Sequence, residues 1–257
     1  METFYLSFLK YILRVKRSTP NCFVYGELGQ YPLYVERKIC VIKYWAKIVS
    51  GDMSSNPLVL SIYQELLQVC TSNPAAVTWA SLVRDLLNEC GLGSYWVSQH
   101  VGDKKVFLEF FKRRVYDIYL QEWGASVLNT SDGRLFKSIK STFVYEPYLD
   151  ILTKSLRIAT SRIRLSSHIF MIERGRWAKV ERQERLCTVC NVVEDEYHCM
   201  IVCPRYANER RSRLSEILCT SPSLYEFTKF MKSKSFKDIK NVGLLALSVQ
   251  IEHKKCI

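Results

Sequence analysis

The sequence lacks the patterns on which most enzyme sites depend. It has no pair of adjacent aspartates for two-metal phosphoryl transfer. Gly26, Gly29, Gly91 and Gly93 lack the spacing and the lysine of a phosphate-binding loop. The run 166–168 (Ser-Ser-His) is local, whereas the members of a catalytic triad meet from distant positions. We therefore expect no catalytic residue on this chain and no small-molecule substrate.

A membrane span and a secretory signal are also missing. No run is long and apolar enough to cross a bilayer. Near the N-terminus, Arg14, Lys16 and Arg17 follow the apolar run instead of preceding it, Lys10 interrupts it, and no small-residue cleavage site follows. We expect an intracellular protein, nuclear or cytoplasmic and not secreted, with no membrane partner. In that setting its ten cysteines indicate reduced thiols or metal ligands and not a disulfide framework.

Positive charge is in excess and lies mainly at the two ends of the chain. The net charge is +12. Residues 1–50 carry eight basic and three acidic side chains and residues 201–257 carry eleven and five, whereas residues 51–100 carry one and four. Such a surplus indicates an anionic partner, most often a nucleic acid, although solubility alone would also explain it. The ends are therefore the expected binding surface.

Apolar residues recur at helical spacing along most of the chain. One stripe predicts a helix over residues 35–49 (Val35, Ile39, Ile42, Ala46 and Val49). Asn56-Pro57 and Asn73-Pro74 are expected to start two further helices, because proline suits a first helical turn. A short N-terminal helix should pack on the core through one set of residues (Phe4, Phe8, Tyr11, Leu13 and Val15).

A long helix is predicted over residues 106–122, and its aromatic stripe favours a buried face over a platform for stacking bases. Strand-like runs are short and few. We predict a mainly α fold: a helical bundle, a small zinc-binding module and a basic helical tail. The expected segments are 1–166, a helical thumb-like region; 167–213, the zinc-binding module; and 214–257, the tail.

The densest cysteine cluster has the spacing C-x2-C-x7-H-x4-C, formed by Cys187, Cys190, His198 and Cys203. A C-x2-C turn lets two thiolates point at one ion, and the second pair completes the donor set that structural zinc prefers. Four protein ligands leave no open position, so we predict one structural Zn2+. Reduced, buried cysteines are the alternative interpretation.

Several neighbours could modify this site. Cys199 could replace His198 as a ligand, although its position should turn its side chain elsewhere, and we favour His198. The acidic run 194–196 could orient His198 through a hydrogen bond.

Arginines surround the cysteine cluster, and the planar guanidinium group suits phosphate. We expect six of them to contact a nucleic acid: Arg174, Arg176, Arg182, Arg185, Arg210 and Arg211. Trp177 and Tyr206 lie among them and could stack on bases. For Trp177, packing against the zinc module is the favoured alternative, because large aromatic side chains usually bury.

Three stretches together resemble the C-terminal region of reverse transcriptases from non-LTR (LINE-type) retrotransposons. RIRLSSHIFMIERGRW and ERLCTVCNVVEDEYHCMIVCPRYANERR resemble the zinc-binding segment of that family. The matching residues, in order, are Gly175, Arg176, Trp177, Cys187, Cys190, Glu196, His198 and Cys203. KRSTPNCFVYGELGQYPLYVERK resembles the stretch after the polymerase palm, where a thumb-like helical region begins. The resemblance covers about residues 8–213.

The departures from that family bear on function. The aspartate pair of the polymerase and the endonuclease are absent, and the acids after Cys203 form no metal-site pattern. The resemblance therefore implies a nucleic-acid-binding remnant of a retrotransposon reverse transcriptase that binds RNA or DNA and has no polymerase site on this chain. A protein-interaction scaffold, or a decayed element fragment without selected function, remains an alternative.

Overall fold

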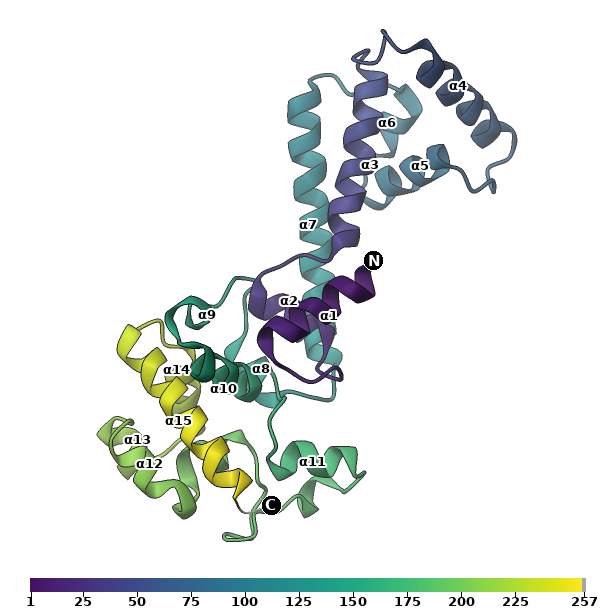
Figure 1. The fold of residues 1–257 in the computed structure, drawn as a ribbon. Helices are drawn as coiled ribbons and strands as arrows, with labels where there is room; N and C mark the ends of the chain where they lie inside the picture. The colour runs from purple at the N-terminus through teal and green to yellow at the C-terminus, as the bar shows by residue number, and fades with distance from the viewer. Residues whose placement is uncertain (256–257) are drawn as a thin grey trace. The chain divides into compact units, whose positions relative to one another are not determined.

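The structure is a computed structural model that describes residues 1–255, and in this range the fold is all-α (Figure 1). Within the described range no strand forms; Leu28 and Tyr145, and Leu186 and Val193, make isolated antiparallel bridges. The predicted mainly α class is confirmed. None of the helices over residues 1–255 combines the length and apolarity that crossing a bilayer requires.

The chain packs as two compact units, here called the middle unit (Tyr31–Ala125) and the terminal unit (Thr3–Gln30 with Ser126–Ile257). All three segments predicted from the sequence contribute residues to the terminal unit. The zinc-binding module and the basic tail therefore share one unit with the N-terminal residues.

The middle unit contains α3 (Leu33–Val49), α4 (Pro57–Ser72), α5 (Trp79–Glu89), α6 (Gly93–Ser98) and most of α7 (Lys104–Asn129). The predicted start at Asn56 is confirmed, because the Asn56 side chain accepts a hydrogen bond from the Val59 amide and Pro57 is the first helical residue. The start predicted at Asn73-Pro74 is wrong. Helix α5 begins at Trp79, where Thr78 and Ser81 form a capping box.

Most of the aromatic stripe of α7 is buried, as predicted. The side chains of Phe107, Phe111 and Tyr119 are buried, and Phe107 contacts Trp45 at 5.9 Å between ring centroids. Phe110, on another side of the helix, is half exposed. The core interpretation is therefore confirmed for Phe107, Phe111 and Tyr119 and is wrong for Phe110.

The terminal unit begins with α1 (Glu2–Leu13) and α2 (Asn21–Leu28), and continues after α7 with α8 (Arg134–Ile139), α9 (Tyr148–Ile151), α10 (Lys154–Arg164) and α11 (Met171–Trp177). The short turns η1 (Arg182–Glu184), η2 (His198–Val202) and η3 (Pro204–Tyr206) follow. Helices α12 (Ala207–Arg211), α13 (Glu216–Thr220), α14 (Leu224–Lys232) and α15 (Phe236–Lys254) complete it. Helix α10 packs along α15 (Figure 1).

The face of α1 that packs inward agrees with the predicted one at Leu13 and differs from it at Phe4, Phe8 and Tyr11. Leu9, Lys10 and Leu13 are buried, whereas Phe4, Phe8 and Tyr11 are 79%, 51% and 60% exposed. Lys10 tolerates burial because its Nζ donates to Arg17 O at 2.7 Å and to Asn21 Oδ1 at 2.9 Å. The predicted N-terminal helix is confirmed, and the two hydrogen bonds of Lys10 allow its side chain to lie on the inward face.

A buried ion pair joins distant parts of the terminal unit. Arg164 on α10 donates from Nε to Glu27 on α2 at 2.5 Å, from Nη1 to Met231 O at 2.9 Å, and lies 2.9 Å from a carboxylate oxygen of Glu146. Glu146 also pairs with Lys140. Every donor group of the guanidinium is thus engaged, which is the condition for keeping such a charge inside a core.

Candidate metal centre

The first half of the metal centre is a closed loop between Leu186 and Val193. The Cys187 amide donates to Val192 O at 2.8 Å, and the Asn191 amide donates to Cys187 O at 2.9 Å. Asn191 has φ 54°, a left-handed conformation that asparagine adopts more readily than most residues. The C-x2-C segment therefore turns back on itself and brings its two thiols together.

The second half is η2, a turn of π-helix that separates His198 from Cys203. The Cys203 amide donates to His198 O at 2.8 Å, so the two residues lie five positions apart across one wide turn. This geometry places the His198 ring and the Cys203 thiol toward the same point. It also gives a physical reason for the H-x4-C spacing in the sequence.

The two halves meet with the geometry of a tetrahedral metal site. Donor atoms of Cys187, Cys190, His198 and Cys203 all lie within 4.8 Å of one another. The Cys203 sulfur lies 3.9 Å from that of Cys187 and 3.7 Å from that of Cys190. Two sulfurs bound to one tetrahedral zinc ion at about 2.3 Å each lie about 3.8 Å apart. The predicted ligand residues are thus brought together, and they can hold one metal ion.

The surroundings of these atoms fit a bound cation. His198 Nε2 is buried without a hydrogen-bond partner among the described residues, which a metal bond would satisfy. Burial and the neighbouring sulfurs raise the pKa of the Cys203 thiol to about 12, so without a cation the group would stay protonated. Burial lowers the pKa of His198, which keeps the imidazole neutral as metal binding requires.

Cys199 lies outside the group of four ligands. It follows His198 on η2 and is 1% exposed, and burial raises the pKa of its thiol well above the ordinary value. A buried, protonated thiol packs as a small apolar side chain. The interpretation of Cys199 as a spectator agrees with this position.

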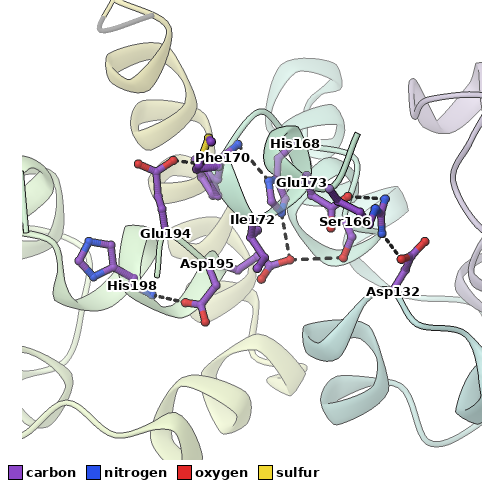
Figure 2. Close-up of polar contacts among 12 residues, drawn as sticks. Asp132, Ser166, His168, Phe170, Ile172, Glu173, Glu194, Asp195 and His198 are labelled. Atoms are coloured by element: carbon purple, nitrogen blue, oxygen red, sulfur yellow. Dashed lines mark hydrogen bonds and ion pairs between the residues drawn. The ribbon is translucent and has the colours of Figure 1, made fainter. Parts of the chain in front are cut away.

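The acidic run beside His198 does not orient its ring as expected. Asp195 accepts a hydrogen bond from the His198 backbone amide at 2.9 Å (Figure 2). Glu196 bonds His168 instead, and Glu194 accepts from the Met171 amide at 2.6 Å. Asp195 and Glu194 therefore bond backbone amides, at His198 and at the start of α11, whereas Glu196 bonds side chains.

Two further histidines, His168 and His253, are buried members of this network. His168 Nε2 lies 2.9 Å from Glu196 Oε1, which also accepts from Ser166 at 3.3 Å (Figure 2). His253 on α15 lies 2.7 Å from the Tyr206 hydroxyl and 3.4 Å from Glu194. Their partners are 28 to 59 positions away in the sequence, so no local pattern could have indicated them.

The six predicted nucleic-acid arginines differ in their surroundings. Arg176 pairs with Asp132 and Glu173, and Arg185 donates to Val180 O at 2.9 Å and Ile172 O at 3.0 Å. Arg182 lies 3.8 Å from Asp195. These three guanidinium groups are engaged within the fold.

Arg210 is buried beside the metal centre. It is 8% exposed, interacts electrostatically with Cys203, and its Nη1 has no hydrogen-bond partner among the described residues. If a divalent ion is bound by three thiolates, the positive charge of Arg210 would offset the excess negative charge around it. Arg174 and Arg211, by contrast, are exposed, and neither side chain makes a hydrogen bond or ion pair within residues 1–255.

The two aromatic residues near these arginines differ in exposure, and in the opposite sense to the one expected. Tyr206 is 1% exposed and hydrogen-bonded to His253, so it cannot stack on a base. Trp177 is 56% exposed, and its favoured interpretation as a core residue is wrong. Trp177 is the last residue of α11, where the chain turns away through Lys179 at φ 57°, and the ring is left outside the packed face.

Comparison with known proteins found no protein-family model that matches the chain, and neither a curated protein nor a solved structure matches it at a significant level. The metal centre and the charges around it are therefore the observations on which a function must rest.

Proposed function

We propose that this chain is a nucleic-acid-binding module that contains one structural zinc ion and derives from the C-terminal region of a non-LTR retrotransposon reverse transcriptase. The observation that carries the proposal is the Cys3His centre, closed by four protein ligands and set in a unit with unpaired exposed arginines.

Zinc is the metal that best suits these donors. Three thiolates and one imidazole form a soft, tetrahedral set, and the sulfur separations of 3.7 and 3.9 Å agree with Zn–S bonds of ordinary length. Since four side chains fill the coordination sphere, the ion has no position for water or substrate. It stabilises the fold and takes no part in a reaction.

Phosphate binding is supported by the free cations of the same unit. Arg174 and Arg211 are exposed and unpaired within the described range, and Lys179 is exposed between the metal loop and α11. An arginine without an internal partner can donate two parallel hydrogen bonds to a phosphate. Arg176, Arg185 and Arg210 act instead by holding the unit together.

The origin in a reverse transcriptase rests on the resemblance of the Gly175–Trp177 and Cys187–Cys203 stretches to that family. Its test is the transcript that encodes this chain. A polymerase reading frame continuous with the codon for Met1 would support the origin, and an unrelated upstream frame would contradict it.

Nucleic-acid binding is tested by fluorescence anisotropy with labelled 20-nucleotide RNA and DNA at 50 and 200 mM salt. If two phosphates are neutralised, affinity should fall about tenfold over that range through counterion release. The double variant Arg174→Ala/Arg211→Ala should bind more weakly and with a shallower salt dependence. Lys105→Ala/Arg113→Ala, which removes the same charge from exposed positions of the middle unit outside the basic ends, is the matched control. The proposal would be contradicted if wild-type protein binds neither oligonucleotide, or if its affinity is the same at both salt concentrations.

A protein-interaction scaffold is a second candidate, and the exposed face of α1 favours it. Phe4, Phe8 and Tyr11 form an apolar stripe on the outer side of that helix. The scaffold would be favoured if immobilised protein still retains a partner protein after nuclease treatment and if Phe4→Ser/Phe8→Ser loses that partner. It would also require that the protein causes no gel shift with any nucleic acid.

A further inference from the structure

Trp177 lies in an open depression of the terminal unit. The depression has a volume of about 510 Å3 and is lined by Lys16, Met171, Arg174, Trp177 and Ala178. More than half of the Trp177 surface is exposed there. An exposed indole between two basic side chains is unusual for a residue type that generally packs inside.

Fixed contacts hold the ring and one cation in place. The Arg176 guanidinium lies over the Trp177 ring at 5.6 Å from its centroid. Arg176 is itself bound by Asp132 and by Glu173 at 2.6 Å. One side of the indole is thus covered by a cation that two carboxylates keep in position, and the ring is pre-organised for stacking.

Lys16 reaches this site from a distant part of the sequence. Its backbone amide donates to Ser167 Oγ at 2.7 Å, and its Nζ donates to His168 O at 2.9 Å. Burial, with the nearby charges of Arg176 and Arg162, lowers the pKa of Lys16, while Glu173 opposes this. Lys16 and Arg174 therefore line the depression that contains the indole, where their positive charges favour a bound anion.

We propose that Trp177 stacks on an unpaired base of a single-stranded nucleic acid, and that Arg174 and Lys16 bind the phosphates flanking that base. The inference rests on the proposed nucleic-acid binding and adds where the strand lies and which form is bound. Base-paired nucleotides keep their faces covered by their neighbours in the stack, so a duplex offers Trp177 no base face. Arg174, exposed and unpaired, supplies the guanidinium for one phosphate, and Lys16 keeps donor capacity beyond its bond to His168.

The test compares Trp177→Ala with Trp177→Phe in the full chain, using 12-nucleotide single-stranded RNA, the same sequence as DNA, and a blunt DNA duplex. Loss of stacking should weaken single-strand binding by about 5- to 150-fold in Trp177→Ala. Trp177→Phe should stay within a few-fold of wild type, and duplex binding should change little in either variant. Tyr225→Ala, at an exposed aromatic residue that lines a different depression, is the matched control. Metal content and melting temperature confirm that each variant folds.

The outcomes separate this inference from the proposal on which it rests. If wild type binds single strands with a salt dependence and Trp177→Ala binds them equally well, nucleic-acid binding stands and the stacking site is wrong. If wild type binds no oligonucleotide, both are wrong. A loss confined to the RNA strand or to the DNA strand supports the site and identifies which polymer it takes.

Discussion

Removal of the metal is expected to destabilise the whole terminal unit and not only the loop that carries Cys187 and Cys190. Cys187, Cys199 and Cys203 belong to a single hydrophobic cluster that also contains Phe227 and Val249, on α14 and α15. Without a cation, the thiols of the ligands and the Nε2 atom of His198 would be buried in that core without a binding partner, which destabilises the folded state.

The size of the effect follows from linkage between binding and folding. A free zinc concentration 100 to 1,000 times the dissociation constant stabilises the folded state by about 2.7 to 4.1 kcal/mol. In a unit of this size, 1 kcal/mol shifts the melting temperature by about 2 to 4 °C. We therefore expect metal-free protein to melt about 10 °C below the zinc-loaded protein, with loss of helical signal from α10 and α15.

The assay is thermal unfolding followed by circular dichroism, before and after chelation, with zinc measured by mass spectrometry. Zinc should be present at one equivalent, and Cys203→Ser should lose it and melt like the metal-free protein. Cys219→Ser, at an exposed cysteine, is the matched control, and Cys199→Ala should also keep one equivalent. An identical melting temperature with and without metal would refute this reasoning, as would a zinc-free protein that is fully folded.

Three further perturbations test the surroundings of the site. Arg210→Met should weaken zinc binding about tenfold in a chelator competition assay, because the positive charge beside Cys203 is lost, and Arg210→Lys should restore part of the affinity. Equal zinc affinities of wild type and Arg210→Met would exclude that role. Glu27→Gln should cost about 3 kcal/mol in urea unfolding, because Arg164 loses a buried partner, and a cost below about 1 kcal/mol would show that Glu146 compensates. Burial lowers the pKa of His253 from its ordinary 6.5 to about 4, so its stabilisation is complete above pH 6.5 and is lost as the pH falls toward 4. Wild type should therefore lose about 1 kcal/mol more than His253→Gln between pH 7 and 5.5 in zinc-saturated urea titrations.

Local patterns predicted the helices well where the signal itself is local. The Asn56-Pro57 start succeeded because cap and first-turn proline act within four residues. The Asn73-Pro74 start carried the same signal but failed, because the Thr78–Ser81 capping box lies a few residues later and competes for the helix start. The group of four candidate ligands could be predicted from the sequence, because each pair of ligands lies within one short segment, the closed loop or the π-turn.

Local sequence patterns could not predict which arginines and aromatic residues are buried and which are exposed. Arg176 has the same side chain as Arg174, yet its partner Asp132 comes from a distant part of the sequence and is brought near by tertiary packing. The same holds for Trp177, whose exposure depends on where α11 ends against the rest of the unit. Composition therefore indicated an anionic partner without identifying which cations remain free to bind it.

The metal loop is mechanically connected to α11, which gives zinc an indirect part in the proposed strand binding. Arg185, just before the first ligand segment, donates to Ile172 O in the first turn of α11 and to Val180 O, three residues after that helix ends. A Cβ atom on Gly175 would lie 2.6 Å from Arg185 Cγ, so only glycine lets this side chain lie against the helix. Because Trp177 stands two residues beyond that contact, loss of the metal should release Arg185 and then the orientation of the indole. In the proposed function, the zinc ion therefore has a positioning role: it holds the proposed stacking residue in place without touching the nucleic acid.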